Sequence, residues 1–390
     1  MTSNRIYALS EEMLKICGTR AAVYDRDNVF FSDDFQDLRD SDFLKINIPK
    51  DLGGGGMSLA ETSQQLRSLA YHAPATALAI NMHLYWLGIA ADLRKSGDTS
   101  LEWILREGAQ GEIFAAGHAE MGNDLPVLLS TTKAERVDGG YQFTGRKMFG
   151  SLTPVWTRFG VHGMDVSDPS APKIIHAFLP RRSAGVDIRR TWDTLGMRAT
   201  SSEDTILDHA FAPEQYVVRV LPAGEIDGYI GAMFANALVG MSNVYLGIAL
   251  RARDLAVQAT QKKTSLAVTR TMAYHPEFQH SAAEMTMEID AMEAHLDRVA
   301  LDWSNGVDHG AAWGAKIVAM KYHVVESAKK VVDLAMDMSG GAGFFKTNEL
   351  ERLYRDVRAG GFHPANSALA HEIVGKTTLG VDLSATPRWG

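Results

Sequence analysis

The chain has 390 residues, of which 46% are hydrophobic and 22% charged, and its net charge is −8. One hydrophobic core rarely serves a chain of this length, so two or three packed regions are expected. The acidic balance gives no electrostatic basis for binding nucleic acid or an anionic membrane, which leaves small molecules or proteins as partners. Cys17 is the only cysteine, so no internal disulfide can form. No apolar stretch of signal-peptide length opens the chain, and a cytoplasmic location is the simplest expectation.

Residues 1–113 show helical periodicity and predict an N-terminal helical domain. Cys17 falls on the apolar side of an amphipathic segment and is predicted to be buried and inert. Four consecutive glycines, 53–56, are typical of a phosphate-binding loop only where a strand precedes them and a Lys-Ser/Thr pair follows. Neither is present here, so we expect a turn, with a new helix beginning near Ser58.

Residues 114–222 change to short alternating segments and predict a middle β-domain, as a barrel or a sandwich. Turn residues separate the segments, as in "VDGGY" at 137–141 and "RRSAGVD" at 181–187. The expected strands are 113–120, 131–137, 141–150, 158–164, 173–180 and 202–213.

Residues 223–390 return to long helical patterns and predict a C-terminal four-helix bundle. The expected helices are 228–262, 280–306, 311–339 and 364–378. Residues 228–250 carry no charge and are long enough to cross a bilayer, but their four glycines and several polar residues favour a buried helix of a bundle.

Four segments, in this order along the chain, resemble the acyl-CoA dehydrogenase superfamily. They are "IPKDLGGGG" at 48–56, "TGRKMFGSLT" at 144–153, "WDTLGMRATSSED" at 192–204 and "MSGGAGFFKTNELERLYRDVR" at 338–358. The resemblance spans nearly the whole chain and implies a mainly α fold with a central β-domain. It also implies a flavin cofactor, but the fold alone does not specify the reaction.

By this resemblance, the cofactor-binding residues are expected on both sides of the flavin. Phe149 would stack on the isoalloxazine ring, the hydroxyl of Ser151 would lie near N5, and Trp192 would lie beside the ring. The alternative for these three residues is core packing or a turn. Gly340 and Gly341 would approach a cofactor in another subunit, so a homodimer or homotetramer is implied. Asn366 completes the implied cofactor-binding set, which is Phe149, Ser151, Trp192, Gly340, Gly341 and Asn366.

Two features leave open how the phosphate end of the cofactor is bound and whether the cofactor is FMN or FAD. Arg352 and Arg355, with Asp356, either grip a phosphate or form a salt-bridged structural turn, and we favour the turn. Dehydrogenases of the family have an Arg-x-x-Phe-Gly pattern where this chain has Lys262 and the segment 263–266. FMN is therefore as plausible as FAD.

Acyl-CoA dehydrogenation requires a carboxylate base that removes a proton beside the thioester carbonyl. The family places this glutamate at one of two positions. In this chain the matching positions hold Pro364 and Ala237, and neither side chain accepts a proton. A dehydrogenase would therefore need a relocated base, such as Glu120 or Asp124.

The polar residues that remain resemble the reduced-flavin-dependent monooxygenase branch of the superfamily, the dibenzothiophene monooxygenase-like enzymes. The resemblance implies that His363, His83, His118 and Ser151 are catalytic and that hydrogen-bond donors stabilise a flavin C4a-hydroperoxide. For His83 and His118 the alternative is a structural core histidine. No metal-binding spacing is present, so no metal is expected.

The sequence thus predicts a monooxygenase that receives reduced flavin from a separate reductase. It would use O2 to oxygenate a small organic substrate, aromatic or heterocyclic. One alternative is an acyl-CoA dehydrogenase with a relocated base, which passes electrons to an electron-transfer flavoprotein. The other is a flavoprotein that kept the fold without catalysis.

Overall fold

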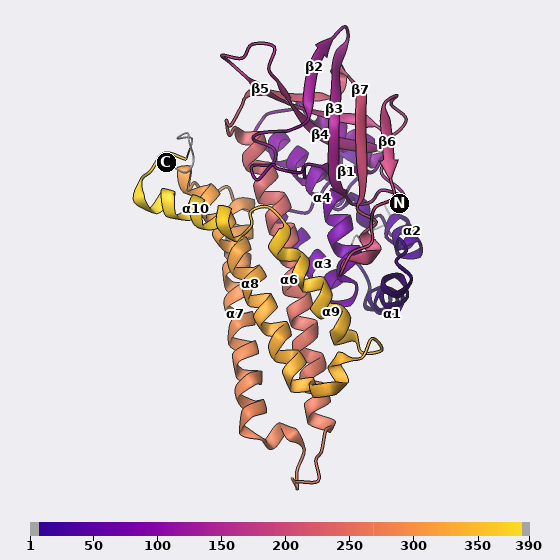
Figure 1. The fold of residues 1–390 in the computed structure, drawn as a ribbon, viewed down its shortest axis with the longest axis vertical. Coiled ribbons are helices and arrows are strands. Elements are labelled where there is room, and N and C mark those ends of the chain that lie inside the picture. The colour runs from indigo at the N-terminus through magenta and orange to yellow at the C-terminus, as the bar shows by residue number, and fades with distance from the viewer. Residues whose placement is uncertain (1–7, 268, 384–390) are drawn as a thin grey trace.

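The computed structural model describes residues 8–267 and 269–383. Helices at both ends of the chain flank one β-sheet, and the longest helices extend away from it (Figure 1). This confirms the predicted mainly α fold with a central β-domain. The N-terminal helices are α1 (Glu11–Asp27), α2 (Ser32–Asp40), α3 (Leu59–His72), α4 (Pro74–Lys95) and α5 (Glu102–Ala109), with 3₁₀ turns η1 (Phe43–Lys45) and η2 (Lys50–Leu52).

The local signals in the N-terminal sequence act as predicted. Helix α3 begins after Ser58, whose hydroxyl accepts from the Glu61 amide while the Glu61 carboxylate accepts from the Ser58 amide. Cys17 is buried on α1, and burial, with nearby Asp34, raises the pKa of its thiol to about 12. The thiol is therefore an inert part of the core.

Every strand in the described residues lies between Phe114 and Pro222, in one mixed sheet with the order β6-β7-β3-β2-β4-β5-β8 and with β1 paired to β4. The strands are β1 (Phe114–Gly117), β2 (Lys133–Val137), β3 (Gly140–Gly150), β4 (Arg158–Asp165), β5 (Lys173–Pro180), β6 (Val186–Arg189), β7 (Glu203–Pro213) and β8 (Val217–Pro222). The 3₁₀ turns η3 (Arg198–Thr200) and η4 (Glu214–Tyr216) flank β7.

The sequence did not predict β6 or β8. The sequence predicts a turn over 181–187, which includes the start of β6. Gly185 and polar neighbours precede the strand, and its outward-facing residues are charged. Both strands lie at the two ends of the strand order, where one side of the strand is not paired. Edge strands carry weaker hydrophobic patterns than central ones, so pairing with β7 and β5, rather than local sequence, defines them.

The C-terminal region consists of α6 (Gly228–Lys262), α7 (Pro276–Ser304), α8 (Trp313–Ser339), α9 (Glu349–Val357) and α10 (Ser367–Leu379), with 3₁₀ turns η5 (Met272–Tyr274), η6 (Gly310–Ala312), η7 (Gly340–Phe344) and η8 (Arg358–Phe362). These helices match the four predicted ones and add α9. Helix α6 alone among the described helices is long and apolar enough to cross a membrane, but 83% of its most apolar window is buried among the other helices. It is a core helix, as its glycines and polar residues indicated.

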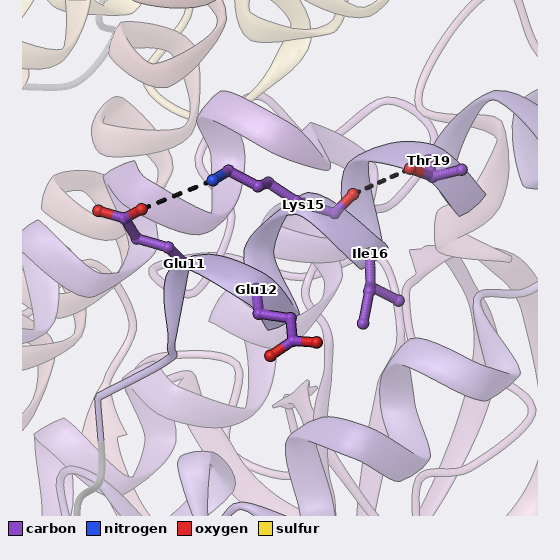
Figure 2. Close-up of a pocket in the computed structure, with 5 residues that line it drawn as sticks. All are labelled: Glu11, Glu12, Lys15, Ile16 and Thr19. Carbon is purple, nitrogen blue, oxygen red and sulfur yellow. Dashed lines mark hydrogen bonds and ion pairs between the residues drawn. The ribbon is translucent and has the colours of Figure 1, made fainter.

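A shallow hollow lies on the exposed side of α1, where the side chains point outward (Figure 2). Lys15 pairs with Glu11 across one helical turn, at 3.6 Å, and the Thr19 hydroxyl donates to the Lys15 carbonyl. Both charged side chains are largely exposed, so this surface contact contributes little. The polar chemistry of the chain lies elsewhere, in the β-domain and where α9 meets it.

Candidate functional site

The exposed end of β3 offers an aromatic surface. Phe149 has a positive φ of 56° and is 52% exposed, although aromatic side chains are usually buried. The Trp192 ring lies edge-on to it, with ring centroids 5.9 Å apart. An aromatic ring at the end of β3 and a second one from the loop after β6 suit the flat apolar face of an isoalloxazine ring, so these residues fit the implied flavin.

Ser151, two residues beyond Phe149, lies in a chain of hydroxyl groups. Its Oγ is 2.8 Å from that of Ser202, which is 2.7 Å from that of Thr200, and Thr200 donates to the Met197 carbonyl at 2.9 Å. Because the Thr200 proton is committed to a carbonyl, Ser202 must donate to Thr200, and Ser151 must donate to Ser202. The remaining lone pairs of Ser151 therefore act as acceptors. This differs from the donor role that we expected near flavin N5.

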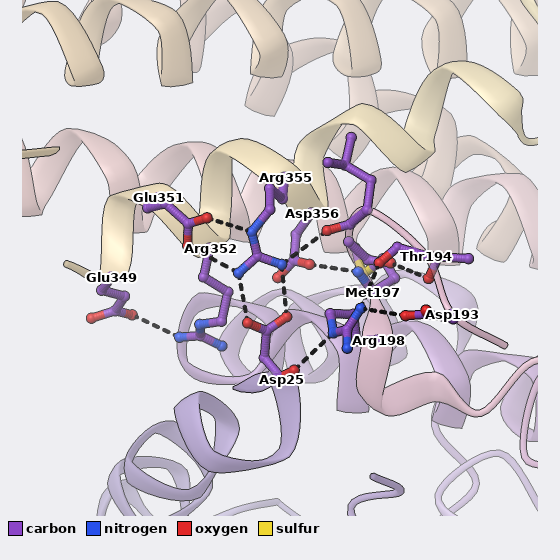
Figure 3. Close-up of polar contacts among 12 residues, drawn as sticks. Asp25, Asp193, Thr194, Met197, Arg198, Glu349, Glu351, Arg352, Arg355 and Asp356 are labelled. Atoms are coloured by element: carbon purple, nitrogen blue, oxygen red, sulfur yellow. Dashed lines mark hydrogen bonds and ion pairs between the residues drawn. The ribbon is translucent and has the colours of Figure 1, made fainter. Parts of the chain in front are cut away.

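The loop that carries Trp192 is fixed to both helical regions (Figure 3). The Asp356 carboxylate accepts from the Met197 amide at 2.6 Å, and Arg355 binds both oxygens of Asp25 on α1 at 2.9 and 2.6 Å. Arg198 donates to the Asp25 carbonyl at 2.9 Å. These contacts give Arg355 and Asp356 a structural role, although the residues lie on helix α9 and not in the turn that we expected.

The resemblance implies that Gly340 and Gly341 approach a cofactor. Within one chain, these glycines lie far from the aromatic surface of Phe149 and Trp192. Gly340 follows α8 with φ +62°, and a Cβ there would contact Lys263, just beyond the end of α6. The Trp192 loop contacts Asp356 near the end of α9, whereas Glu349 at the start of α9 pairs with Arg251, which lies 12 residues, or about 18 Å of helix, before Lys263. The structure therefore does not place Gly340 and Gly341 beside Phe149, Ser151 and Trp192 of the same chain.

His363 lies in a loop anchored against α6 and α8. Its Nε2 is 2.7 Å from the Tyr245 hydroxyl, and the buried Lys321 ammonium donates to the carbonyls of His363, Gly360 and Ala365. Burial, with the charge of Lys321, lowers the pKa of His363 to about 3, so the imidazole is neutral at pH 7. Nearby, the Asn366 side chain accepts from the Leu369 amide and caps α10. Its contact with a cofactor stays a prediction.

His83 has both ring nitrogens paired with the backbone. Nε2 is 2.9 Å from the Leu44 carbonyl, and Nδ1 accepts from the Phe114 amide at 3.1 Å. The imidazole is therefore the neutral tautomer protonated at Nε2, and burial lowers its pKa to about 4. With no nitrogen available to a ligand, the structural alternative for His83 is the better supported one.

His118 follows β1, and its Nε2 is buried without a hydrogen-bond partner. Its neighbour Glu120 accepts from the hydroxyls of Ser130 and Thr132 and forms a fully buried ion pair with Lys147 at 2.6 Å. Burial alone would raise the pKa of Glu120, but the charge and hydrogen bond of Lys147 outweigh it and lower the pKa to about 2. Glu120 is therefore a poor base, and Asp124, the other relocated base considered, is exposed.

A small interior cavity lies between α3, α4 and α6, beside one of the two positions where the family places its base. The amide of Asn81 approaches the carbonyl of Ala237 there, at 3.5 Å. None of the side chains that line the cavity is charged, and its polar members are Asn47, Thr62, Ser63, Asn81, Tyr85 and Asn236. Its volume, about 10 Å³, admits at most a water molecule, so it is no binding site for an organic substrate.

Sequence reasoning missed several polar residues that the fold brings together. Lys147, His162, His176, Thr200 and Tyr245 were not singled out. For His162, His176 and Tyr245 the only signal is a polar residue inside an otherwise apolar strand or helix, as in "GVHGM" and "IIHAF", whereas Lys147 and Thr200 lie in polar stretches and give none. In the described residues, no cluster of three or more His, Cys, Asp or Glu side chains has the arrangement of a metal site.

Two family matches place the chain. Residues 9–97 match the acyl-CoA dehydrogenase N-terminal domain, and residues 239–368 match the acyl-CoA dehydrogenase C-terminal domain. Together they span more than half of the sequence. The chain belongs to the acyl-CoA dehydrogenase superfamily, as the four sequence segments indicated.

Curated relatives divide between two reaction types. A putative acyl-CoA dehydrogenase of Bacillus subtilis is 29% identical, covering 90% of this chain and 91% of the relative. The amino sugar nitrososynthase of Streptomyces peucetius is 28% identical, covering 96% and 93%. Dibenzothiophene monooxygenase of Rhodococcus erythropolis is 27% identical, covering 88% and 86%.

Solved structures agree with this division. KijD3, in complex with FMN and dTDP-3-amino-2,3,6-trideoxy-4-keto-3-methyl-D-glucose, has a TM-score of 0.84 and 25% identity, covering 97% of this chain and 93% of that one. The chain is therefore a flavin-dependent oxidoreductase of this superfamily. Its substrate and its use of oxygen are questions for the site itself.

Proposed function

We propose that the protein is a reduced-flavin-dependent monooxygenase, which transfers one oxygen atom from O2 to a small organic substrate through a flavin C4a-hydroperoxide. One observation carries the proposal. The two positions where the family holds its carboxylate base are Pro364 and Ala237, and a neutral imidazole, His363, adjoins the first. Oxygen transfer needs hydrogen-bond donors and exclusion of water, and it does not need a carboxylate base.

The hydroxyl chain supports the use of reduced flavin. Reduced flavin carries a proton on N5, whereas oxidised flavin offers a lone pair there. The orientation of the chain from Ser151 to Thr200 leaves Ser151 as an acceptor. An acceptor at this position favours the N–H of reduced flavin over the lone pair of oxidised flavin. FMN and FAD are both compatible with these contacts.

His363 would act on the oxygen adduct or on the substrate. Its Nε2 is held by Tyr245, which fixes the ring and leaves Nδ1 directed elsewhere. A neutral imidazole with one fixed nitrogen is suited to donate or accept one hydrogen bond, and its lowered pKa makes it a poor base. Ser151 would position the flavin. We assign no catalytic role to His83 and place His118 in a separate polar row described below.

The substrate is a neutral or weakly charged small molecule. The residues that the resemblance places at the flavin, Phe149, Ser151 and Trp192, carry no charge and would give a charged substrate no counter-charge. We expected an aromatic or heterocyclic substrate. The relatives named for amino sugars and for dibenzothiophene extend this substrate class to amines and thioethers. A homodimer or homotetramer, a separate flavin reductase and a cytoplasmic location belong to the same proposal.

The deciding experiment supplies reduced FMN or FAD and oxygen to the purified protein in a stopped-flow spectrometer. We expect a transient absorbance of the C4a-hydroperoxide. Because the Bacillus subtilis relative is a putative acyl-CoA dehydrogenase, the dehydrogenase alternative is tested as well. Acyl-CoA thioesters of several chain lengths are mixed anaerobically with the holoenzyme. Rapid bleaching of the flavin by any of them, with no oxygen adduct, would establish the dehydrogenase instead.

A further inference from the structure

A row of polar side chains crosses the β-domain at one level of the sheet. His162 on β4 is paired directly with His176 on β5, and His176 is paired with Arg219 on β8. On the other side, β1 runs parallel to β4 in a register that brings His118, the residue after β1, next to His162. Side chains at one level of adjacent strands share a face, so these four line up across four strands.

The rings of this row touch one another. Ring centroids are 5.4 Å apart for His118 and His162, 5.8 Å for His162 and His176, and 5.3 Å for His176 and Tyr229 of α6. His162, His176 and Tyr229 are each at most 1% exposed. The row is therefore a continuous polar line buried between the sheet and the helices.

The row contains polar atoms without a hydrogen bond of normal geometry to the protein, although the backbone at Val127 and Leu129 approaches His176 and His162. They are Nε2 of His118, Nδ1 of His162, both ring nitrogens of His176 and the hydroxyl of Tyr229. Each buried polar atom without a partner costs roughly 1 to 3 kcal/mol, and so many in one line are not tolerated dry. Bound water molecules would satisfy these atoms.

The histidines of the row are neutral at pH 7. Burial, with the positive charge of Lys147, lowers the pKa of His176 to about 3 and that of His162 well below its usual value. Burial, with His176 and Lys147, does the same for His118. A neutral imidazole donates from one nitrogen and accepts at the other, so a line of imidazoles and water molecules passes a proton by a series of short transfers.

The two ends of the row differ in their surroundings. At the outer end Arg219 forms ion pairs with Asp98 and Asp227, and its guanidinium lies over the Tyr229 ring at 5.4 Å. The Asp98 side chain is 36% exposed, so this end meets solvent.

At the inner end His118 precedes Ala119, whose carbonyl accepts from the Met148 amide at 2.9 Å. The next residue along that strand is Phe149, the aromatic residue assigned to the flavin face. The row therefore runs from the protein surface to the flavin-facing end of β3.

We propose that this histidine row and its bound water molecules form a proton path between solvent at the Asp98–Arg219–Asp227 cluster and the bound flavin. The inference rests on flavin binding at β3 and not on the monooxygenase reaction. When anionic reduced flavin is oxidised by two equivalents of ferricyanide, two electrons pass to the two iron centres and one proton leaves N5. The row carries that proton to solvent, and the reverse route supplies it on reduction.

The test measures proton release in the holoenzyme. Reduced holoenzyme is mixed with ferricyanide under anaerobic conditions, and a pH-indicator dye reports the proton while flavin absorbance reports the electrons. In the wild type we expect proton release to keep pace with oxidation. In His176→Phe, which keeps the ring volume but removes two nitrogens, proton release should slow by about tenfold or more. His295→Phe, a half-buried histidine on α7 outside the row, should behave as the wild type.

Two further results decide the matter. Electron density at high resolution should show water molecules between the rings of the row. Tyr229→Phe should also slow proton release, and it provides the test if His176→Phe does not fold. A dry row, or proton release within twofold of the wild type in both variants, would overturn the proposal. Because neither oxygen nor an organic substrate is present, these outcomes do not depend on whether the protein proves to be a monooxygenase.

Discussion

His83 and His176 are equally buried, each with 1% of its surface exposed, yet their surroundings differ. His83 is held by two backbone groups, whereas His176 has no hydrogen bond of normal geometry and only an approach of the Val127 backbone. The first histidine fixes the junction between the segment around Leu44 and strand β1. The second lies in a row that only water completes. For buried histidines, the state of the ring nitrogens separates a structural role from a functional one more clearly than burial does.

The buried Glu120 carboxylate is fully hydrogen-bonded and ion-paired, in contrast to the His176 ring. Its removal should have the largest effect on stability. Glu120→Gln leaves the buried Lys147 ammonium without its counter-charge, which costs roughly 3 to 5 kcal/mol of unfolding free energy. Denaturant unfolding measures this loss. The matched control is Glu135→Gln, whose ion pair with Lys133 is exposed and should change stability little.

The same carboxylate predicts a dependence on pH. Because the folded pKa of Glu120 is lowered to about 2, its stabilising contribution is complete above the unfolded pKa, near 4.5. It is lost as the pH falls from there towards 2. The acid limb of the stability profile should be flatter in Glu120→Gln than in the wild type, and an unchanged limb would show that other carboxylates control acid unfolding.

His83→Phe should be the next most damaging change. The phenyl ring leaves the Leu44 carbonyl and the Phe114 amide unpaired, at about 1 to 3 kcal/mol for each group. Thermal unfolding measures the effect beside His280→Phe, an exposed histidine on α7. If His83→Phe folds with wild-type stability but loses turnover, the catalytic role that the resemblance implied would be restored.

His363 has one nitrogen paired and one available, and we expect its loss to affect chemistry more than folding. In His363→Ala, product formation should fall by roughly 10²-fold and H2O2 release per reduced flavin should rise. Coupled assays of product and peroxide measure both, with His371→Ala as the control. Wild-type rate and coupling in His363→Ala would identify the residue as a structural partner of Tyr245 only.

Ser202→Ala tests the direction of the hydroxyl chain. Without Ser202 as its acceptor, Ser151 is released to donate, so the preference for reduced flavin should weaken by about 1 kcal/mol. The flavin reduction potential should become more negative by roughly 20 mV. Ser201→Ala, at the neighbouring position, is the control, and an equal shift in both variants would show that the chain does not orient Ser151.

His176→Phe should have the smallest effect on stability, because it removes only atoms without a hydrogen bond of normal geometry to the protein. The unfolding free energy should change by less than about 1 kcal/mol, or rise. Thermal melts of His176→Phe and His83→Phe, read together, give the direct comparison of the two environments. A large loss in His176→Phe would show that its water molecules hold the sheet together.

Much of the fold followed from the sequence alone, because its signals are local. The hydroxyl of Ser58 with Glu61 three residues later specifies the start of α3, and the uncharged run 228–250 specifies most of α6. Four ordered segments identified the superfamily, and the aligned positions of Pro364 and Ala237 indicated that the usual base is missing. These conclusions depend on residues within one element or one motif.

Only the tertiary structure decided what the polar side chains do. His118, His162 and His176 are separated by at least 14 residues in the sequence, and strand pairing alone brings their rings into contact. Whether His83 is satisfied depends on Leu44 and on the start of β1, and the direction of the Ser151 hydroxyl depends on Thr200. Sequence patterns report which residues are apolar enough to be buried. Hydrogen-bond partners come from distant segments, so they exist only once those segments have packed together.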